Sequence, residues 1–189
     1  SFDKDKSRLV ALGFLERAGI DFHATYSTMT SLTAVRLVLS LAVHNSLPIF
    51  HADVPQAFLR ADLDTEVYLT LPKGINIYDE TVTSRSTWNG FVLRLLRSLY
   101  GHPNAGLFWE RKYRSILRQA GFKEMLGWEC MYYHDVYKVI LSVYVDDFKM
   151  AGPTKHMDKG WATIREHLQL DPPTPLGDHL GCGQRDIEL

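Results

Sequence analysis

The sequence has few cysteines, no long apolar run and no excess of charge of either sign. Only Cys130 and Cys182 are cysteines among its 189 residues, and neither belongs to a pair with zinc-site spacing. We therefore expect free thiols in a reducing, intracellular environment. No apolar run reaches the roughly 18 residues that cross a bilayer. Nothing at the start resembles a signal peptide, so neither a membrane anchor nor export is expected.

The overall charge of the chain does not distinguish between classes of function. The 21 basic and 22 acidic residues give a net charge of -1, which by itself gives no indication of nucleic-acid binding. Residues 94–123 are locally basic, with a single acid, Glu110. The seven basic residues there are Arg94, Arg97, Arg111, Lys112, Arg114, Arg118 and Lys123. A solvated helix face explains such a run more often than a phosphate-binding surface does, and charge alone favours the former.

Apolar periodicity predicts one globular domain of mixed α and β structure. The length and the 46% hydrophobic content are sufficient for a substantial core. Helices are predicted over residues 31–47, 104–121 and 155–168, the second of them capped by Asn104. Residues 73–90, rich in Gly, Asn, Ser and Thr, are predicted to be a loop or insertion. The predicted strands are 6–14, 49–58 with regular pairing ending past Asp53, 64–72, 137–145 and a short stretch after Asp147.

The stretch LSVYVDDFKMAG, residues 141–152, places two adjacent acids at the turn of a predicted hairpin. Asp146 and Asp147 repel each other and resist burial, so a positive group is expected beside them. Asp53 ends another apolar strand, and three such carboxylates suit a pair of magnesium ions, which prefer oxygen ligands. On spacing alone, a turn role for Asp53 and a solvated hairpin tip for the acid pair remain open alternatives.

Five ordered blocks of the chain resemble the copia-type LTR-retrotransposon reverse transcriptase. They are KSRLVALGFLERAGIDF (6–22), ADVPQAFLRADLDTEVYLTLPKG (52–74), RSLYGHPNAGLFW (97–109), YVDD (144–147) and LGDHLG (176–181). Five blocks in this order over nearly all 189 residues are more specific than YVDD alone. The resemblance implies an RNA-directed DNA polymerase that uses deoxynucleotides, a primed RNA or DNA template and two Mg²⁺ ions, with Mn²⁺ as an alternative.

The resemblance also implies the architecture. It is an α+β right-hand polymerase palm with partial fingers, whose catalytic β-hairpin packs beside a strand and helices. Residues 1–189 would be a single reverse-transcriptase domain fragment. Within it, residues 1–48 would hold partial fingers and the first palm helix, and residues 49–189 the palm, with a fingers-like insertion around residues 73–103. A thumb and the integrase and RNase H domains of the polyprotein are expected outside the fragment, which would work in a cytoplasmic virus-like particle.

The resemblance assigns roles to individual residues. The metal ligands it implies are the carboxylates of Asp53, Asp146 and Asp147 and the backbone carbonyl of Val54. The substrate-binding residues it implies are Phe58 under the sugar, Tyr100 and Gly101 at the template and incoming base, Asn104, and Arg8 at the triphosphate. For Phe58, an ordinary core position remains an open alternative.

Four departures from the family pattern support a second hypothesis. His102-Pro103-Asn104 replaces the usual Leu-Lys-Gln, Gly106-Leu107 replaces Pro-Arg, Lys149 replaces an apolar residue and Leu12 replaces a lysine. The lost cations favour a catalytically inactive remnant that keeps the palm fold and binds nucleic acid through residues 94–123. A metal-binding or structural domain without a nucleic-acid partner is a third hypothesis. Retention of all three aspartates favours the active polymerase.

Overall fold

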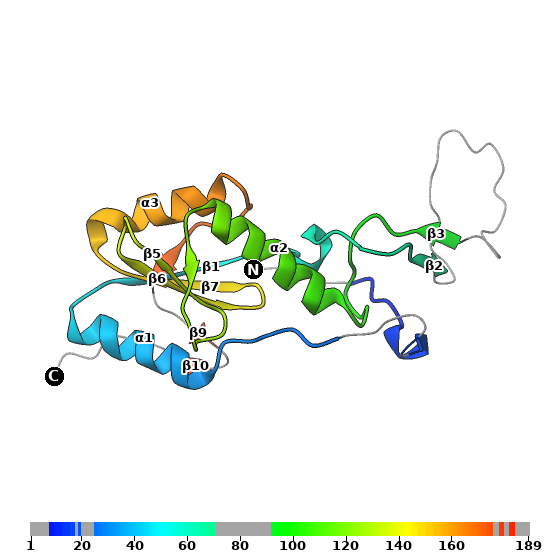
Figure 1. The fold of residues 1–189 in the computed structure, drawn as a ribbon, viewed down its shortest axis with the longest axis horizontal. Helices are drawn as coiled ribbons and strands as arrows, with labels where there is room; N and C mark the ends of the chain where they lie inside the picture. Colours follow the sequence, from blue (N-terminus) through cyan, green and yellow to red (C-terminus); the bar gives the residue numbers. More distant parts are fainter. Residues whose placement is uncertain are drawn as a thin grey trace, which may run out of the picture.

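A six-stranded antiparallel sheet forms the centre of the molecule (Figure 1). The computed structural model describes residues 8–17, 19, 25–70 and 92–175, and the backbone of 178–179 and 182–183. The strand order is β4-β5-β6-β7-β1-β8. In that order the bounds are Lys123–Glu124, Met131–His134, Val139–Tyr144, Asp147–Ala151, Ile49–Asp53 and Thr174–Pro175. The sheet brings β1 beside β7, although almost a hundred residues separate them in the chain.

Helices cover both faces of this sheet. In Figure 1, α2 (Ala105–Gln119) and α3 (Thr154–Arg165) lie over one face and α1 (Leu32–His44) lies under the other. Alternate residues of a strand point to opposite faces, so Phe148 and Met150 join the core under α2 and α3. Ala151 and Ile49 join the smaller core against α1. The mixed α and β architecture with an antiparallel sheet agrees with the predicted fold class.

The predicted helices are present, with one correction at the start of α2. Trp109, Tyr113, Ile116 and Leu117 form the buried stripe of α2, as the periodicity predicts. The side chain of Asn104 makes no capping hydrogen bond, so the prediction that it caps α2 is wrong. Its backbone N–H bonds to Nδ1 of His102 instead, at 3.1 Å. No side-chain cap holds the start of α3 either, whereas the Ser31 hydroxyl caps α1 by accepting from Ala34 N–H.

The strand predicted over residues 6–14 is wrong for the described part, residues 8–14. Residues 8–12 pair with no strand that the structure describes, and a short 3₁₀ helix, η1, follows at Gly13–Leu15. Several apolar side chains here are exposed, Phe14 to 81%. The segment therefore contacts a neighbouring turn through its backbone and does not join a described sheet.

That neighbouring turn is Tyr100–His102. The N–H of Ala11 donates to the carbonyl of Tyr100 at 2.7 Å. Gly101 has φ +83°, and a Cβ there would lie 2.2 Å from the carbonyl oxygen of Ala11. A Cβ on Gly13 would likewise lie 2.1 Å from the carbonyl oxygen of Gly101. Both positions need glycine for the two backbones to approach this closely.

The remaining elements lie at the margins of the sheet. The 3₁₀ helix η2 (Ala57–Arg60) follows β1, and the hairpin β2 (Tyr68–Thr70) and β3 (Val92–Arg94) extends from one end of the molecule (Figure 1). Strands β9 (Asp178–His179) and β10 (Cys182–Gly183) pair with each other. The loop predicted over residues 73–90 lies outside the described residues. Among the helices that the structure describes, none has the length and apolar content to cross a membrane.

Candidate metal centre and substrate cleft

The pairing of β1 with β7 builds the site one residue pair at a time. Ile49 is opposite Ala151, His51 is opposite Lys149, and Asp53 is opposite Asp147. All six side chains share the face that α1 covers, because each pair lies two residues along from the last. The pair Ile49–Ala151 packs against α1, and the acidic pair stands at the far end of the strands. The acidic residues therefore lie at the end of the strands that is away from the apolar contacts with α1.

A two-residue turn, Val145-Asp146, joins β6 to β7 and holds the third acid. Val145 has φ +54°, which is unusual for a β-branched residue. Two hydrogen bonds hold the turn in place. The indole N–H of Trp109 donates to the carbonyl of Val145 at 2.6 Å. The N–H of Val54 donates to the carbonyl of Asp146 at 2.8 Å. The core helix α2 and the end of β1 thus both fix the hairpin tip, at the cost of local strain.

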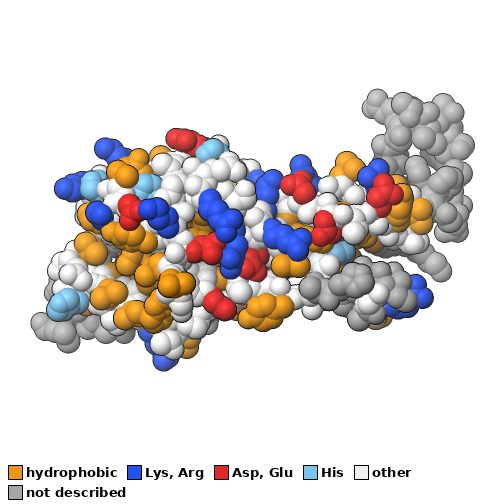
Figure 2. All heavy atoms as spheres, viewed as in Figure 1, with side chains coloured by type: hydrophobic (Ala, Val, Ile, Leu, Met, Phe, Trp, Pro, Cys, Tyr) orange, Lys and Arg blue, Asp and Glu red, His pale blue; other side chains and the backbone are white. Residues whose placement is uncertain are grey.

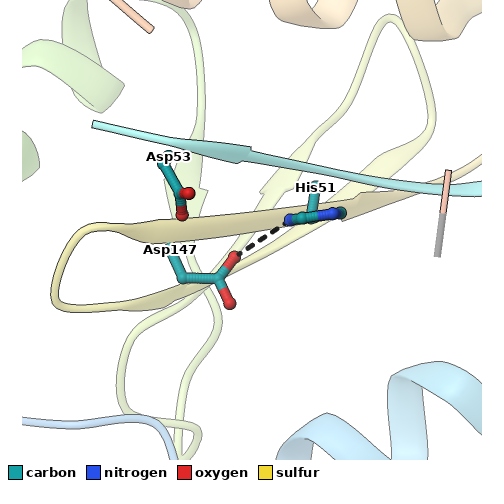
Figure 3. A group of neighbouring side chains, drawn as sticks. All are labelled: His51, Asp53 and Asp147. Carbon is teal, nitrogen blue, oxygen red and sulfur yellow. Dashed lines mark ion pairs between the residues drawn. The ribbon is translucent and has the colours of Figure 1, made fainter. Parts of the chain in front are cut away.

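The structure brings two of the three predicted acids into one cluster with a histidine. Ligand atoms of His51, Asp53 and Asp147 lie within 4.8 Å of one another (Figure 3). Asp146 is exposed on the turn and is not part of that group. It lines the same cleft as Asp53 and acts on it electrostatically. Burial, followed by the charges of Asp147 and Asp146, raises the pKa of Asp53.

The chemistry of these donors fits a divalent cation. Carboxylate oxygens are the ligands that Mg²⁺ and Mn²⁺ prefer, and the charges of Asp147 and Asp146, which contribute to the raised pKa of Asp53, are ones that a bound cation would offset. Val54, predicted to offer its carbonyl, lines the cleft beside Asp53. The identity of the ion is not determined by this donor set, because imidazole also suits other metals.

A cleft of about 650 Å³ opens beside the acids. The predicted substrate residues Arg8 and Tyr100 line it together with Asp53, Val54 and Asp146. The Arg8 guanidinium lies over the Tyr100 ring, 5.6 Å from its centroid. Gln56 and Asp171 also line the cleft and were not predicted. Gln56 has φ +56°, and the N–H of Asp171 donates to the carbonyl of Asp53 at 2.9 Å.

Three other predicted substrate residues lie around the cleft without lining it. Phe58 is half-buried against the main core, with its ring edge-on to Tyr100 at 5.0 Å between centroids. Gly101 is exposed at the turn against residues 10–11. The Asn104 side-chain oxygen is buried and has no hydrogen-bond partner in the described structure. Phe58 therefore contacts both the main core and the cleft residue Tyr100.

The basic segment 94–123 is neutralised by acids along its length. Figure 2 shows blue and red side chains interleaved on the face that includes α2. Each of the seven basic residues forms an ion pair. The pairs are Arg94–Glu66, Arg97–Asp62, Lys112–Asp62, Arg111–Asp64, Arg114–Glu110, Arg114–Glu124, Arg118–Glu124 and Lys123–Asp135. The solvated-face interpretation therefore accounts for this segment without a phosphate ligand.

Lys149 is buried in the sheet and should reduce stability near neutral pH. Its side chain is 2% exposed, and burial lowers its pKa to about 8, an effect that the charge of Asp147 partly offsets. The folded state holds this proton less tightly than the unfolded chain. The penalty is therefore complete below pH 8 and fades between pH 8 and 10.5.

We predict that Lys149→Met raises the free energy of unfolding by about 1–3 kcal/mol at pH 7. The gain should shrink steadily above pH 8. Urea unfolding in a chelator at pH 7 and pH 10 measures both effects. Lys155→Met, at an exposed position of α3, is the matched control. An equal gain at both pH values would show that burial of the charge is not the cause.

The chain is similar in sequence to a known family and to several known proteins. The chain matches the family described as "Reverse transcriptase (RNA-dependent DNA polymerase)" over residues 2–185. It is 32% identical to a retrovirus-related Pol polyprotein from transposon TNT 1-94 of Nicotiana tabacum, over 79% of this chain and 11% of the relative. The polyprotein from transposon RE2 of Arabidopsis thaliana is 33% identical, over 80% and 10%. The Transposon Ty1-DR4 Gag-Pol polyprotein of Saccharomyces cerevisiae is 28% identical, over 100% and 11%.

Paired acids at adjoining strand ends and a match over nearly the whole chain define the class. The chain belongs to the reverse transcriptase (RNA-dependent DNA polymerase) family. Its relatives among plant and yeast transposon polyproteins identify it more closely as the copia-type retrotransposon form. It spans about a tenth of the length of these curated relatives. No solved structure matches it.

Proposed function

We propose that this chain carries the catalytic centre of an RNA-directed DNA polymerase that extends a primer on an RNA or DNA template. The observation that carries the proposal is the pairing of Asp53 with Asp147, with Asp146 in the adjoining turn, in a chain of this family. Three carboxylates from two neighbouring strands and the adjoining turn can hold cations on which a primer hydroxyl and a nucleotide phosphate meet. The sheet with α2 and α3 is then the palm. Residues 1–48 would hold partial fingers and the first palm helix, and the insertion around residues 73–103 would be fingers-like.

Asp53 and Asp146 are the groups that face the cleft, and with Asp147 and the Val54 carbonyl they would hold Mg²⁺ or Mn²⁺. The bound ions would supply the positive charge that activates the primer hydroxyl and stabilises the phosphate under attack. The role of the protein is to fix these oxygens before substrate arrives. It does so through the β1–β7 pairing and the two hydrogen bonds to the hairpin tip.

The lining residues Arg8 and Tyr100 suit a nucleotide. Arg8 offers a guanidinium for the triphosphate oxygens, and the Tyr100 ring below it offers a flat surface for a sugar or base. Phe58 stands edge-on behind Tyr100, so the two rings form one rigid wall against which a 2′-hydroxyl would be excluded. Gly101 allows the backbone to turn there, and we assign the buried amide oxygen of Asn104 to the template side.

The partners follow from the relatives. Their printed names are those of Pol and Gag-Pol polyproteins, and this chain matches only about a tenth of each. We propose that integrase and RNase H domains belong to the same polyprotein, and that primer–template and deoxynucleotides are the substrates in a cytoplasmic particle. The remnant hypothesis is less favoured. The basic residues of 94–123, through which the remnant would bind nucleic acid, form ion pairs with acids of this chain. All three site aspartates are also retained.

Primer extension tests the proposal. The chain is incubated with an RNA template, a DNA primer, the four deoxynucleotides and Mg²⁺, with the missing flanking regions supplied in cis. Extension should require the template and the ion. It should vanish in Asp146→Asn and persist in Asp158→Asn, which changes an exposed acid of α3. A folded protein that binds primer–template but never extends it would favour the remnant instead.

A further inference from the structure

We infer that His51 contributes an imidazole nitrogen to the divalent-cation site beside Asp53 and Asp147, and that this nitrogen makes the site prefer Mn²⁺ over Mg²⁺. The inference rests on the proposed function, which places a cation among these carboxylates. It adds a ligand that is not among the metal ligands implied by the resemblance. It also gives the chain a selectivity that an all-oxygen site lacks.

The first argument is the position of the ring. His51 precedes Asp53 by two residues on β1, so both side chains point to the same face of the sheet. Figure 3 shows the His51 ring and the Asp147 carboxylate turned toward each other, with Asp53 nearby on the same strand as His51. The His51 side chain is 24% exposed and that of Asp147 is 18% exposed. The three groups thus stand together at a partly sheltered place that solvent ions can enter.

The second argument is a distance. Nδ1 of His51 lies 3.9 Å from Oδ1 of Asp147, which is too long for a hydrogen bond. Two ligands on one ion, each about 2.1 Å from it, are separated by roughly 3.0 Å when adjacent and about 4.2 Å when opposite. The observed separation falls inside that interval. The gap between the ring and the carboxylate is therefore one in which a small movement of either side chain would let both bind the same ion.

The third argument is the orientation of the ring. Nε2 of His51 lies 2.9 Å from the hydroxyl of Thr174, its partner on β8. When Nε2–H donates to that hydroxyl, Nδ1 keeps its lone pair and directs it to the side of Asp147. A hydrogen bond on the outer nitrogen is the usual means by which proteins orient a metal-binding histidine.

A nitrogen ligand changes which ion is favoured. Mg²⁺ binds oxygen almost exclusively, whereas Mn²⁺ follows the transition-metal order and accepts imidazole more readily. Replacing His51 should therefore affect Mn²⁺ much more than Mg²⁺. A purely structural role for the ring would move both affinities together.

Pulsed EPR of the purified chain with one equivalent of Mn²⁺ is the direct test. A ¹⁴N coupling from a directly bound imidazole is expected in the wild-type protein, so the readout does not depend on any variant folding. The coupling should disappear in His51→Gln. It should persist in His44→Gln, which alters an exposed histidine at the end of α1. Bound Mn²⁺ without ¹⁴N coupling in the wild type would overturn the inference.

Titration gives the selectivity. We expect His51→Gln to weaken Mn²⁺ binding about tenfold and Mg²⁺ binding, read by competition, less than twofold. Equal weakening of both ions would overturn the inference. If Mn²⁺ binding is lost in Asp53→Asn but carries no nitrogen signal, the inference fails and the proposed function stands. If the wild type neither binds Mn²⁺ through Asp53 nor extends primers, the proposed function itself fails.

Discussion

Asp53→Asn is expected to reduce primer extension at least about 10³-fold while leaving the metal-free protein more stable than the wild type. Asp53 is the only strand-borne acid on β1, and it pairs directly with Asp147. An amide retains the shape and one oxygen but removes the negative charge that a cation requires. Loss of activity with gain of stability is the signature of a residue kept for chemistry rather than for folding.

The gain in stability follows from the electrostatics of the site. Burial and the charges of Asp147 and Asp146 raise the pKa of Asp53, so the folded state holds that proton more tightly than the unfolded chain does. The stabilisation by protonation is complete below the ordinary pKa of 3.8 and is lost as pH rises through the higher pKa of the folded state. At neutral pH the ionised carboxylate therefore opposes folding, and Asn removes that opposition.

Two measurements check this prediction. Thermal unfolding in a chelator at pH 7 should give a higher midpoint for Asp53→Asn than for the wild type, and the difference should vanish near pH 3. Adding Mg²⁺ should raise the midpoint of the wild type and not that of the variant. Asp158→Asn is the control for both. A variant that loses stability in the chelator would mean that Asp53 makes a structural contact and that the acids are not in conflict.

Local patterns predicted the parts of the fold that depend on near neighbours in sequence. The stripe of Trp109, Tyr113, Ile116 and Leu117 has the helical period, and all four side chains are buried. The hairpin also follows from an apolar run broken by two acids, although only Asp146 lies in the turn and Asp147 is the first residue of β7. In each case the residues that decide the structure lie within a few positions of one another.

Tertiary contacts decided what the sequence analysis missed. The apolar segment 8–12 was read as a strand, but no described strand partners it, and it lies against the turn at Gly101. Asn104 stands at the N-cap of α2 with a suitable side chain, yet its amide oxygen is buried and makes no capping hydrogen bond. Such outcomes depend on which distant backbone approaches, and periodicity carries no information about that.

The candidate site divides in the same way. Asp53 and Asp147 were expected together and are paired, whereas His51 was not predicted as a site residue. A signal was present, since a residue two positions before a strand-end acid must share its face. Gln56 and Asp171 had no such signal. Their places in the cleft depend on a left-handed backbone at Gln56 and on a bond from Asp171 to β1.

Trp109 should have the largest effect on stability of any side chain that contacts the hairpin tip. It is 1% exposed, packs against Tyr113 and belongs to the main core. We expect Trp109→Ala to cost about 3–5 kcal/mol of unfolding free energy, because it leaves a large cavity. Urea unfolding followed by circular dichroism measures the loss. Trp128→Phe, at a partly exposed ring, should cost less than about 0.5 kcal/mol.

Trp109→Phe separates packing from positioning. Phenylalanine keeps most of the buried ring but cannot donate to the carbonyl of Val145, which then loses a 2.6 Å hydrogen bond at a strained turn. We expect a cost of about 1–2 kcal/mol in stability. Primer extension should fall by roughly 10²-fold, which is more than the loss of stability explains. The reason is that Asp146 and Asp147 directly follow the residue whose carbonyl is released. Full extension by a folded Trp109→Phe protein would show that the pairing of β1 with β7 and the hydrogen bond from Val54 to Asp146 are sufficient to hold the carboxylates in place.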